Sequence, residues 1–337
     1  MNGTTSAHPS TIRPRFVLPD KSQPRVLDWD AILAPLPELE SICEPLHMTI
    51  GRPGVISGHP GGYKSWLAQG ALVYAALDMP LLGRFAFRPG TRCLLIDYEQ
   101  GEREARRRFA KLIRGTGSTG VGRLGYVYAP IPSWNPPQSL RSKAEDALCR
   151  LLEDVDYCVV DSLVGCQPGT DENKAEASAP LTLAANVSER VGCHIQLIDH
   201  VSPKGTSTMQ RGHTSKLGAS SVIMHTKYDK DTKLTECTTV RCQVAPAEDW
   251  CPTFSFTCRD SPDKAATYLE MGGEASPARD VRAATVLEYV GSNPGTTGNA
   301  MMRALGTGSK RDMVLLVNEL IGTGRIVRVS NGLYPKA

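Results

Sequence analysis

A glycine-rich segment followed by lysine and serine is the part of the sequence best suited to chemistry. The segment GHPGGYKS runs from Gly58 to Ser65, directly after the short apolar stretch GVIS and before an apolar segment of helical length. Glycines let the backbone curl so that several N–H groups face one anion, and a helix N-terminus adds to the attraction. Lys64 would neutralise phosphate charge, and the Ser65 hydroxyl would bind magnesium. The predicted phosphate-binding loop comprises Gly58, His59, Pro60, Gly61, Gly62, Tyr63, Lys64, Ser65 and Trp66.

This loop departs from the pattern GxxxxGK(S/T) at one position. Tyr63 stands where the pattern has its second glycine, so a tyrosine must adopt a backbone conformation that glycine usually supplies. The alternative is an ordinary glycine-rich turn with a chance Lys-Ser pair. The order of strand, loop and helix favours the phosphate loop.

Three further apolar segments end in side chains that could act on a phosphate. RCLLIDYEQ ends in Asp97 and Glu99, and Glu99 is the candidate for orienting and activating an attacking water. DYCVVDSL places Asp161 where an acid can hold magnesium through water. GCHIQLIDHVS ends in Asp199 and His200. His200 could sense the terminal phosphate, or it could simply cap its strand.

A parallel sheet would bring these segment ends to one edge, and the spacing of apolar residues predicts such a sheet. The expected strands are Gly54–Ser57, Arg92–Asp97, Tyr126–Ala129, Tyr157–Asp161 and His194–Asp199. The expected helices are Ser65–Leu77, Glu102–Arg114, Ser142–Leu152 and Ala175–Val191. Strands and helices alternate, which indicates an α/β fold. Beyond residue 223, KLTECTTVRC and CPTFSFTC predict antiparallel strands that extend the sheet.

The chain divides into an N-terminal arm (1–45), the α/β domain (46–260), a linker (261–280) and a small C-terminal unit (281–337). The last unit has three expected helices, near Val281–Val290, Gly298–Leu305 and Lys310–Thr323. It ends in RIVRVSNGLYPK, where Asn331-Gly332 predicts a hairpin turn. Three helices followed by a hairpin indicate a winged helix.

Composition limits the class of protein. The 337 residues carry a formal charge of +3 and are 41% hydrophobic, which excludes a uniformly basic coat protein and an acidic disordered chain. The longest apolar stretch, Trp66–Leu82, is interrupted by Gln69, Asp78 and Pro80 and is shorter than the roughly 20 residues of a membrane span. The N-terminus lacks the apolar core of a signal peptide. We therefore expect a cytoplasmic protein that does not enter a membrane.

Taken together, GHPGGYKSWLA, LLIDYEQGEREARRRFAKL, VVDSL, GCHIQLIDH and RGHTSKLGASSVI resemble the RecA-like ATPases. The resemblance covers about Thr49 to Cys258 and is to the branch of RepA-type replicative helicases and related DnaB-like and KaiC-like proteins. It implies ATP and Mg2+ as cofactors, with Glu99 as the catalytic base, Asp161 on the magnesium side and His200 at the sensor position. It also implies a homo-oligomeric ring, often a hexamer, with single-stranded DNA in its channel.

The same resemblance implies a basic residue that reaches the neighbouring subunit's γ-phosphate from a late strand, where the family often has Lys-x-Arg. Arg241-Cys242-Gln243 is the nearest match, and its second basic residue is missing. Arg211 and Lys216 are competing candidates for this role. Slow or partner-dependent hydrolysis is therefore expected.

Two segments are candidates for DNA contact. The loop Val201–Lys216 contains Lys204, Arg211 and Lys216 and no acid, so it could follow a phosphate backbone or be an ordinary surface loop. Residues 281–337 hold seven basic and three acidic residues, a net charge of +4, which suits duplex DNA at a winged helix. Many winged helices bind proteins instead.

Three functions compete on these grounds. The first is an ATP-driven DNA motor or helicase loader in the replication of a mobile element. The second is an ATP-gated DNA-binding regulator with little turnover, and the third and weakest is a metabolic kinase. A zinc site is disfavoured, because the spacings among Cys237, Cys242, Cys251 and Cys258 lack CxxC pairs.

Overall fold

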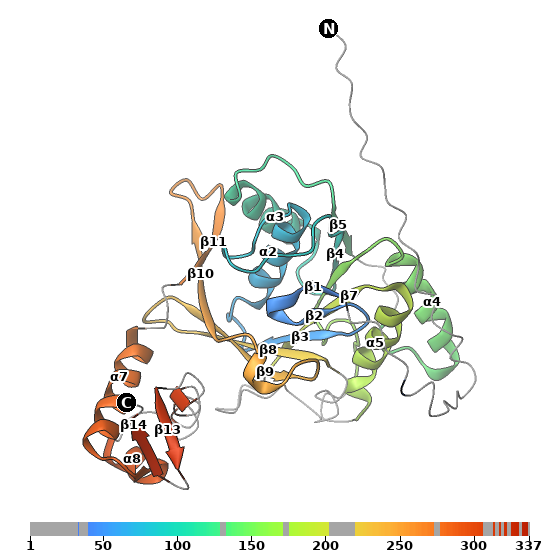
Figure 1. Ribbon diagram of the computed structural model, residues 1–337. Coiled ribbons are helices and arrows are strands. Elements are labelled where there is room, and N and C mark those ends of the chain that lie inside the picture. Colours follow the sequence, from blue (N-terminus) through green and yellow to red (C-terminus); the bar gives the residue numbers. More distant parts are fainter. Residues whose placement is uncertain are drawn as a thin grey trace.

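The computed structural model describes residues 33, 40–128, 133–170, 175–201, 220–272, 277–305, 313, 317, 320–321, 325–329 and 332–335. Figure 1 shows helices packed about a central sheet, followed by a small C-terminal unit. The Arg211, Lys204 and Lys216 positions lie outside the described residues, as does most of the loop Val201–Lys216.

The central sheet has nine strands within the described residues, in the order β11-β10-β9-β8-β3-β7-β6-β4-β5. Its strands are β3 (Gly54–Gly58), β4 (Cys93–Asp97), β5 (Leu124–Tyr128), β6 (Tyr157–Asp161), β7 (His194–His200), β8 (Val222–Tyr228), β9 (Thr235–Cys242), β10 (Phe254–Asp260) and β11 (Thr267–Met271). The helices beside it are α2 (Lys64–Ala76), α3 (Glu102–Gly115), α4 (Arg141–Leu151) and α5 (Ala179–Val191). The predicted α/β fold with a mainly parallel sheet is thus confirmed.

Register places the carboxyl ends of the parallel strands side by side. Gly58 at the end of β3 pairs with His200 in β7 and with Thr226 in β8. Asp97 at the end of β4 pairs with Asp161 at the end of β6. Ligands of open parallel sheets bind outside this edge.

Alternating apolar residues cover both faces of the sheet. Leu95 of β4 packs in a core shared with α2 and α3, whereas Leu94 and Ile96 pack in a second core with α4 and α5. Neighbouring residues of a strand point to opposite faces, so a strand buried on both faces is apolar throughout. The two cores hold the strand ends rigidly, which lets polar side chains converge at the edge.

The predicted linker at 261–280 is wrong in its first half, because β11 lies there. Thr267–Met271 pairs antiparallel with β10, in a register that joins Phe256 to Met271. Leu269 packs so closely on Gly70 of α2 that a Cβ on this glycine would lie 2.0 Å from the leucine Cδ1. The alternation of TYLEM is only five residues long, too short to separate a strand from a weak helix.

The boundary expected at residue 45 also needs correction. Strand β1 (Ser41–Cys43) pairs with β2 (Met48–Thr49) across a short 3-10 helix, Glu44–Leu46. Ile42 and Cys43 are each 1% exposed and belong to the core beside α2. The α/β domain therefore begins before residue 46.

The C-terminal unit has a hydrophobic core of its own, formed by residues that include Val286, Met301 and Leu333. Helices α7 (Pro277–Ser292) and α8 (Gly298–Leu305) accompany a three-stranded antiparallel sheet in the order β12-β14-β13, and β12 lies between the two helices in the sequence. These strands are β12 (Thr296–Thr297), β13 (Ile326–Val329) and β14 (Gly332–Pro335). The first two expected helices and the terminal hairpin are thereby observed, whereas most of the third expected helix, Lys310–Thr323, lies outside the described residues.

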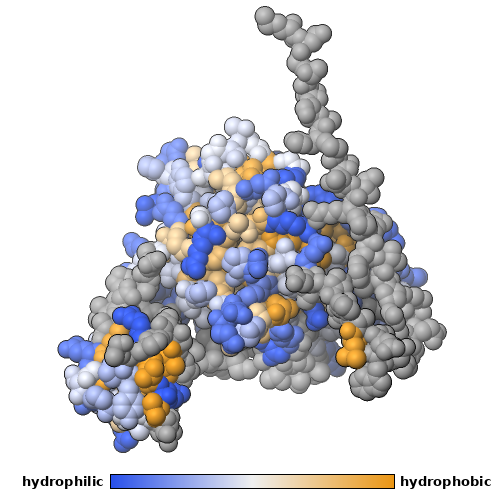
Figure 2. All heavy atoms as spheres, viewed as in Figure 1, coloured by the Kyte–Doolittle hydropathy of each residue, from blue (hydrophilic) through white to orange (hydrophobic). Residues whose placement is uncertain are grey.

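Figure 2 shows a face of the molecule on which hydrophilic residues predominate and hydrophobic ones form small areas. In the described part of the chain, no helix combines the length and apolar character needed to cross a membrane.

Candidate active site

The glycine-rich segment forms a tight loop between β3 and α2, as predicted. A Cβ at Gly58 would lie 2.5 Å from the backbone oxygen of Thr226, so this position requires glycine. Tyr63 has φ +55° and ψ +18°, the left-handed conformation that the missing glycine would have supplied. Its ring lies 5.0 Å from that of Tyr228, a contact that helps to hold the tyrosine in place.

Lys64 lies under this loop and is only 5% exposed. Its Nζ donates to the carbonyl oxygens of Gly58 and His59, both at 2.9 Å, and lies 3.4 Å from Nδ1 of His200. Burial lowers the pKa of Lys64, and the nearby carboxylates of Asp161 and Glu99 oppose that shift. The ammonium group is thus held where it could exchange loop carbonyls for phosphate oxygens.

Asp161 ends β6 and is 1% exposed. It accepts hydrogen bonds from the side chains of Ser65 and Gln100. Burial raises its pKa to about 6, and the charge of Glu99 adds to the effect. A buried carboxylate beside a serine hydroxyl offers the hard oxygen ligands that magnesium prefers. Ser65 and Asp161 could therefore hold a magnesium ion.

Glu99 follows β4 in a turn that Asp97 fixes. Oδ1 of Asp97 accepts the backbone N–H groups of Glu99 at 3.0 Å and of Gln100 at 2.9 Å. The Glu99 carboxylate lies 3.7 Å from Nε2 of His200. Hydrogen bonds from His200 and Ser162 lower the pKa of Glu99 to about 2 despite partial burial. Glu99 is therefore ionised at neutral pH and faces the edge of the sheet.

His200 bridges the lysine and the glutamate. The Lys64 ammonium has only hydrogens to offer, so Nδ1 of His200 must accept from it. Nε2 then carries the imidazole proton and points toward Glu99. His200 thus joins the phosphate loop to the turn after β4, more than the simple strand cap that the sequence left open.

The structure brings together five of the predicted residues: Lys64, Ser65, Glu99, Asp161 and His200. Arg241 is not among them. It lies in β9 opposite Ile223, which in turn pairs with Val55, three residues before the end of β3. Its Nε is buried without a hydrogen-bond partner in the described residues.

Two glutamines that the sequence did not single out also reach this site. Gln100 donates to Asp161, and Gln69 of α2 donates to Gln100. Gln69 gave one usable signal, because it interrupts the apolar run WLAQGALVYAAL. Gln100 gave none beyond its place after Glu99.

A cavity of about 450 Å³ opens beside the phosphate loop. Tyr63 and Tyr228 line it, together with Thr232–Thr235 and Thr257–Asp260. Nearby on α2, the ring of Trp66 lies 5.2 Å below the guanidinium of Arg108. This side of the loop therefore offers aromatic surface next to a phosphate site.

Comparison of the sequence with known proteins identifies its family. No curated protein matches the chain. Among solved structures, the chain is similar to the RadB recombinase, with 12% sequence identity, a TM-score of 0.45, and coverage of 65% of this chain and 90% of that one. A family model described as an AAA domain matches residues 18–206, which span the phosphate loop and all the strand-end acids. The chain belongs to this AAA domain family, a family of ATPases.

Proposed function

We propose that the protein binds ATP with magnesium at the carboxyl edge of its sheet and hydrolyses it. One observation carries this proposal: Lys64, Asp161, Glu99 and His200 come from four separate segments and converge beside one glycine-rich loop. Lys64 donates to the loop carbonyls, Asp161 accepts from Ser65, and His200 lies 3.4 Å from Lys64 and 3.7 Å from Glu99. A buried lysine beside ionisable acids is costly to the fold, which is typical of a functional site.

Each residue then has a defined task. The loop N–H groups and Lys64 would hold the β- and γ-phosphates. Ser65 and Asp161 would hold magnesium, which supplies positive charge beside the phosphate oxygens when bound. Glu99 would orient the attacking water and accept its proton as the water oxygen bonds to the γ-phosphorus and the bond from that phosphorus to the β–γ bridging oxygen breaks, which releases ADP and phosphate. His200 would report the terminal phosphate, because it contacts both Lys64 and Glu99.

The adenosine would occupy the cavity beside Tyr63. The paired rings of Tyr63 and Tyr228 offer stacking surface, and β10 supplies polar groups at Thr257 and Asp260. The tyrosine that replaces glycine in the loop would then serve nucleotide binding directly.

We further propose that the protein acts on DNA, as a RepA-like replicative helicase or helicase loader of a mobile element. Support comes from the family resemblance and from the net charge of +4 on residues 281–337. The C-terminal unit would be a winged helix on duplex DNA. A homo-oligomeric ring, a hexamer by resemblance, would enclose single-stranded DNA, with Arg241, Arg211 or Lys216 acting on the neighbouring subunit's nucleotide.

ATP turnover with and without single-stranded DNA tests this proposal. We expect turnover that DNA stimulates in the wild type and that Glu99→Gln abolishes. Glu248→Gln, at an exposed acid in the short helix Ala247–Asp249, is the control and should behave as the wild type. ATP binding with negligible turnover under both conditions would exclude the motor.

That last result would favour the second candidate, an ATP-gated DNA-binding regulator. Two observations support it: Tyr63 occupies a strained position in the loop, and Arg241-Cys242-Gln243 lacks the second basic residue that the resembled family often has. A regulator would show oligomerisation and DNA binding that depend on ATP without requiring hydrolysis. Sedimentation with ATP and DNA distinguishes the two when Glu99→Gln is compared with the wild type. A motor needs turnover to leave the DNA, so its variant should stay bound longer than the wild type. A regulator should bind DNA equally in both forms.

A further inference from the structure

Two glutamine side chains form a hydrogen-bonded chain that ends on Asp161. Nε2 of Gln69 donates to Oε1 of Gln100 at 3.1 Å, and Nε2 of Gln100 donates to Oδ2 of Asp161. Gln69 is fully buried in the second turn of α2, the helix that begins at Lys64. These two hydrogen bonds therefore link α2 to Asp161 at the end of β6.

The chemistry of the groups fixes the direction of this chain. An ionised carboxylate only accepts hydrogen bonds, so Gln100 must turn its NH₂ group toward Asp161. Its oxygen then faces Gln69, which must donate in turn. The amide oxygen of Gln69 is left buried with no partner in the described residues, at a cost to stability. A buried glutamine held at such a cost points to a task other than packing.

The backbone already holds Gln100 in place from the other side. Its N–H donates to Asp97 at 2.9 Å, and the second oxygen of Asp97 accepts from the hydroxyl of Tyr126 at 3.0 Å. The turn after β4 thus fixes where the Gln100 side chain starts, and Gln69 fixes which way its amide faces. The amide can then hold one oxygen of Asp161 and leave the rest of the carboxylate to turn toward Ser65.

We propose that Gln100 and Gln69 are positioning residues that orient the Asp161 carboxylate for magnesium. This inference rests on the proposed function in one respect, the identity of the ion. Groups that hydrogen-bond to metal ligands commonly change metal affinity by about 10- to 100-fold when they are removed. We therefore expect Gln100→Leu and Gln69→Met to weaken magnesium use while leaving the phosphate loop intact.

The test is a magnesium titration of nucleotide binding, with a fluorescent ATP analogue as the probe. In both variants, the magnesium concentration for half-maximal binding should rise about tenfold or more. Binding of the analogue in EDTA should stay within about twofold of the wild type. Gln100→Glu should have a larger effect at neutral pH, because it sets a second carboxylate against Asp161, and acidification should partly reverse it.

Gln196→Met is the matched control. Gln196 is also fully buried with one amide atom lacking a partner, but it contacts His194 near the amino end of β7. A magnesium dependence that changes equally in the control and in the two variants would overturn the proposal. So would a Gln100→Leu variant with the wild-type dependence.

A second measurement needs no nucleotide, so it separates this proposal from the proposed function. The side-chain amide protons of Gln100 should exchange with solvent more slowly than those of exposed Gln138, as seen by NMR, and Gln69→Met should abolish the difference. If the wild type fails to bind ATP yet shows this protection, the proposed ATP binding is wrong, but the hydrogen bonds from Gln69 to Gln100 and on to Asp161 are supported. Fast exchange of the Gln100 amide protons in the wild type would contradict the proposed positioning of Asp161 by Gln100 and Gln69.

Discussion

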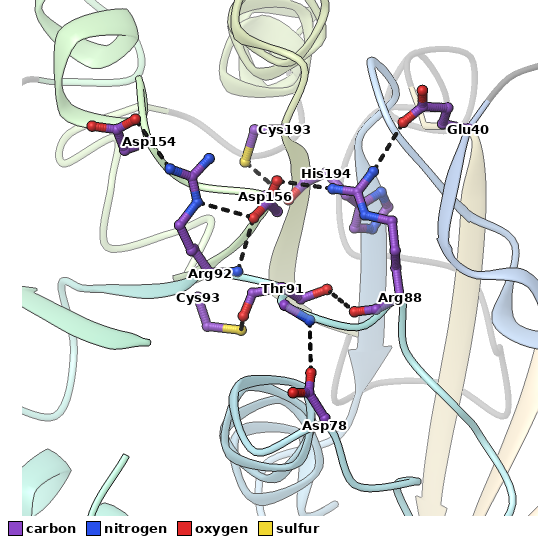
Figure 3. A network of polar contacts seen from close by, with 11 residues as sticks. Glu40, Asp78, Arg88, Thr91, Arg92, Cys93, Asp154, Asp156, Cys193 and His194 are labelled. Atoms are coloured by element: carbon purple, nitrogen blue, oxygen red, sulfur yellow. Dashed lines mark hydrogen bonds and ion pairs between the residues drawn. The ribbon is translucent and has the colours of Figure 1, made fainter. Parts of the chain in front are cut away.

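Two aspartates at opposite ends of strand β6 are held in contrasting ways. Asp156, just before the strand, accepts from the Arg88 guanidinium at 2.8 Å, and from the backbone N–H and Nε of Arg92 at 2.9 and 3.2 Å (Figure 3). Asp161, at the other end, accepts from the neutral side chains of Ser65 and Gln100; burial raises its pKa, and the charge of Glu99 raises it further. Arginines balance the charge of Asp156, whereas the buried charge of Asp161 lowers the stability of the fold.

The comparison shows that the amino edge of the sheet stabilises the fold, whereas the carboxyl edge lowers its stability. The amino edge gathers matched charges, with Arg88 also bonded to Glu40 and Arg92 to Asp154. The carboxyl edge gathers acids around a buried lysine, an arrangement that a phosphate and a cation would complete. Activity often requires such a locally destabilised site, and the remainder of the fold compensates.

The largest expected effect is on ATP turnover, which should depend on the carboxyl edge of the sheet and not on the amino edge. Glu99→Gln should lower ATP turnover by about 10²- to 10⁴-fold, the usual contribution of a positioned base. Glu40→Gln, which changes an acid at the amino edge, should leave turnover unchanged. A steady-state phosphate-release assay measures both. Equal turnover in the two variants would remove Glu99 from catalysis.

Asp156→Asn should have the next largest effect, on stability alone. It leaves the half-buried Arg88 without its closest carboxylate and should cost about 2–4 kcal/mol in the free energy of unfolding. Urea unfolding measures the loss. Turnover per folded molecule should match the wild type, so a catalytic defect would contradict the division between the edges.

Asp161→Asn should act in the opposite sense. The folded pKa of about 6 lies above the ordinary value of 3.8, so this acid stabilises the fold only below pH 4 and costs stability as the pH rises through 6. The variant should therefore gain about 1–3 kcal/mol near pH 7, and the gain should vanish near pH 4. Thermal unfolding across this range checks the prediction, with exposed Asp154→Asn as the control that shows no such trend. A loss of stability at pH 7 would contradict it.

The smallest effect concerns His200, the largest contributor to the lowering of the Glu99 pKa to about 2, with Ser162 and Lys64 also contributing. In His200→Asn, that pKa should move up toward 4.5, so the acidic limb of the turnover profile should appear at higher pH. A profile recorded between pH 4 and 7 would show the shift. An unchanged limb would mean that His200 does not set the ionisation of the glutamate.

Much of this arrangement could be predicted from the sequence. Strands that are buried on both faces consist of apolar runs, and each such run ended in the polar residue found at the edge: Glu99 after β4, Asp161 in β6 and His200 in β7. The missed elements had weaker local signals. β11 is a short edge strand that is defined by its pairing with β10, and its Leu269 packs on Gly70, which is far away in the sequence.

The electrostatic contrast between the strand ends could not be predicted either. Asp156 and Asp161 flank the same apolar strand, and nothing local distinguishes them. Their difference arises because Arg88 and Arg92 arrive at one end through the fold, whereas Glu99 and Gln100 arrive at the other. The same holds for Gln69, which became meaningful only once α2 lay beside the turn after β4.

Calorimetric binding of ATP in the presence of magnesium tests the central claim most directly. We predict saturable binding to the wild type and to Lys143→Met, which alters an exposed lysine of α4, and binding weaker by about 100-fold in Lys64→Met. A charge-assisted phosphate contact from a buried lysine accounts for a loss of that size. Equal affinity in all three proteins, or no binding to the wild type, would contradict an ATP site at the carboxyl edge.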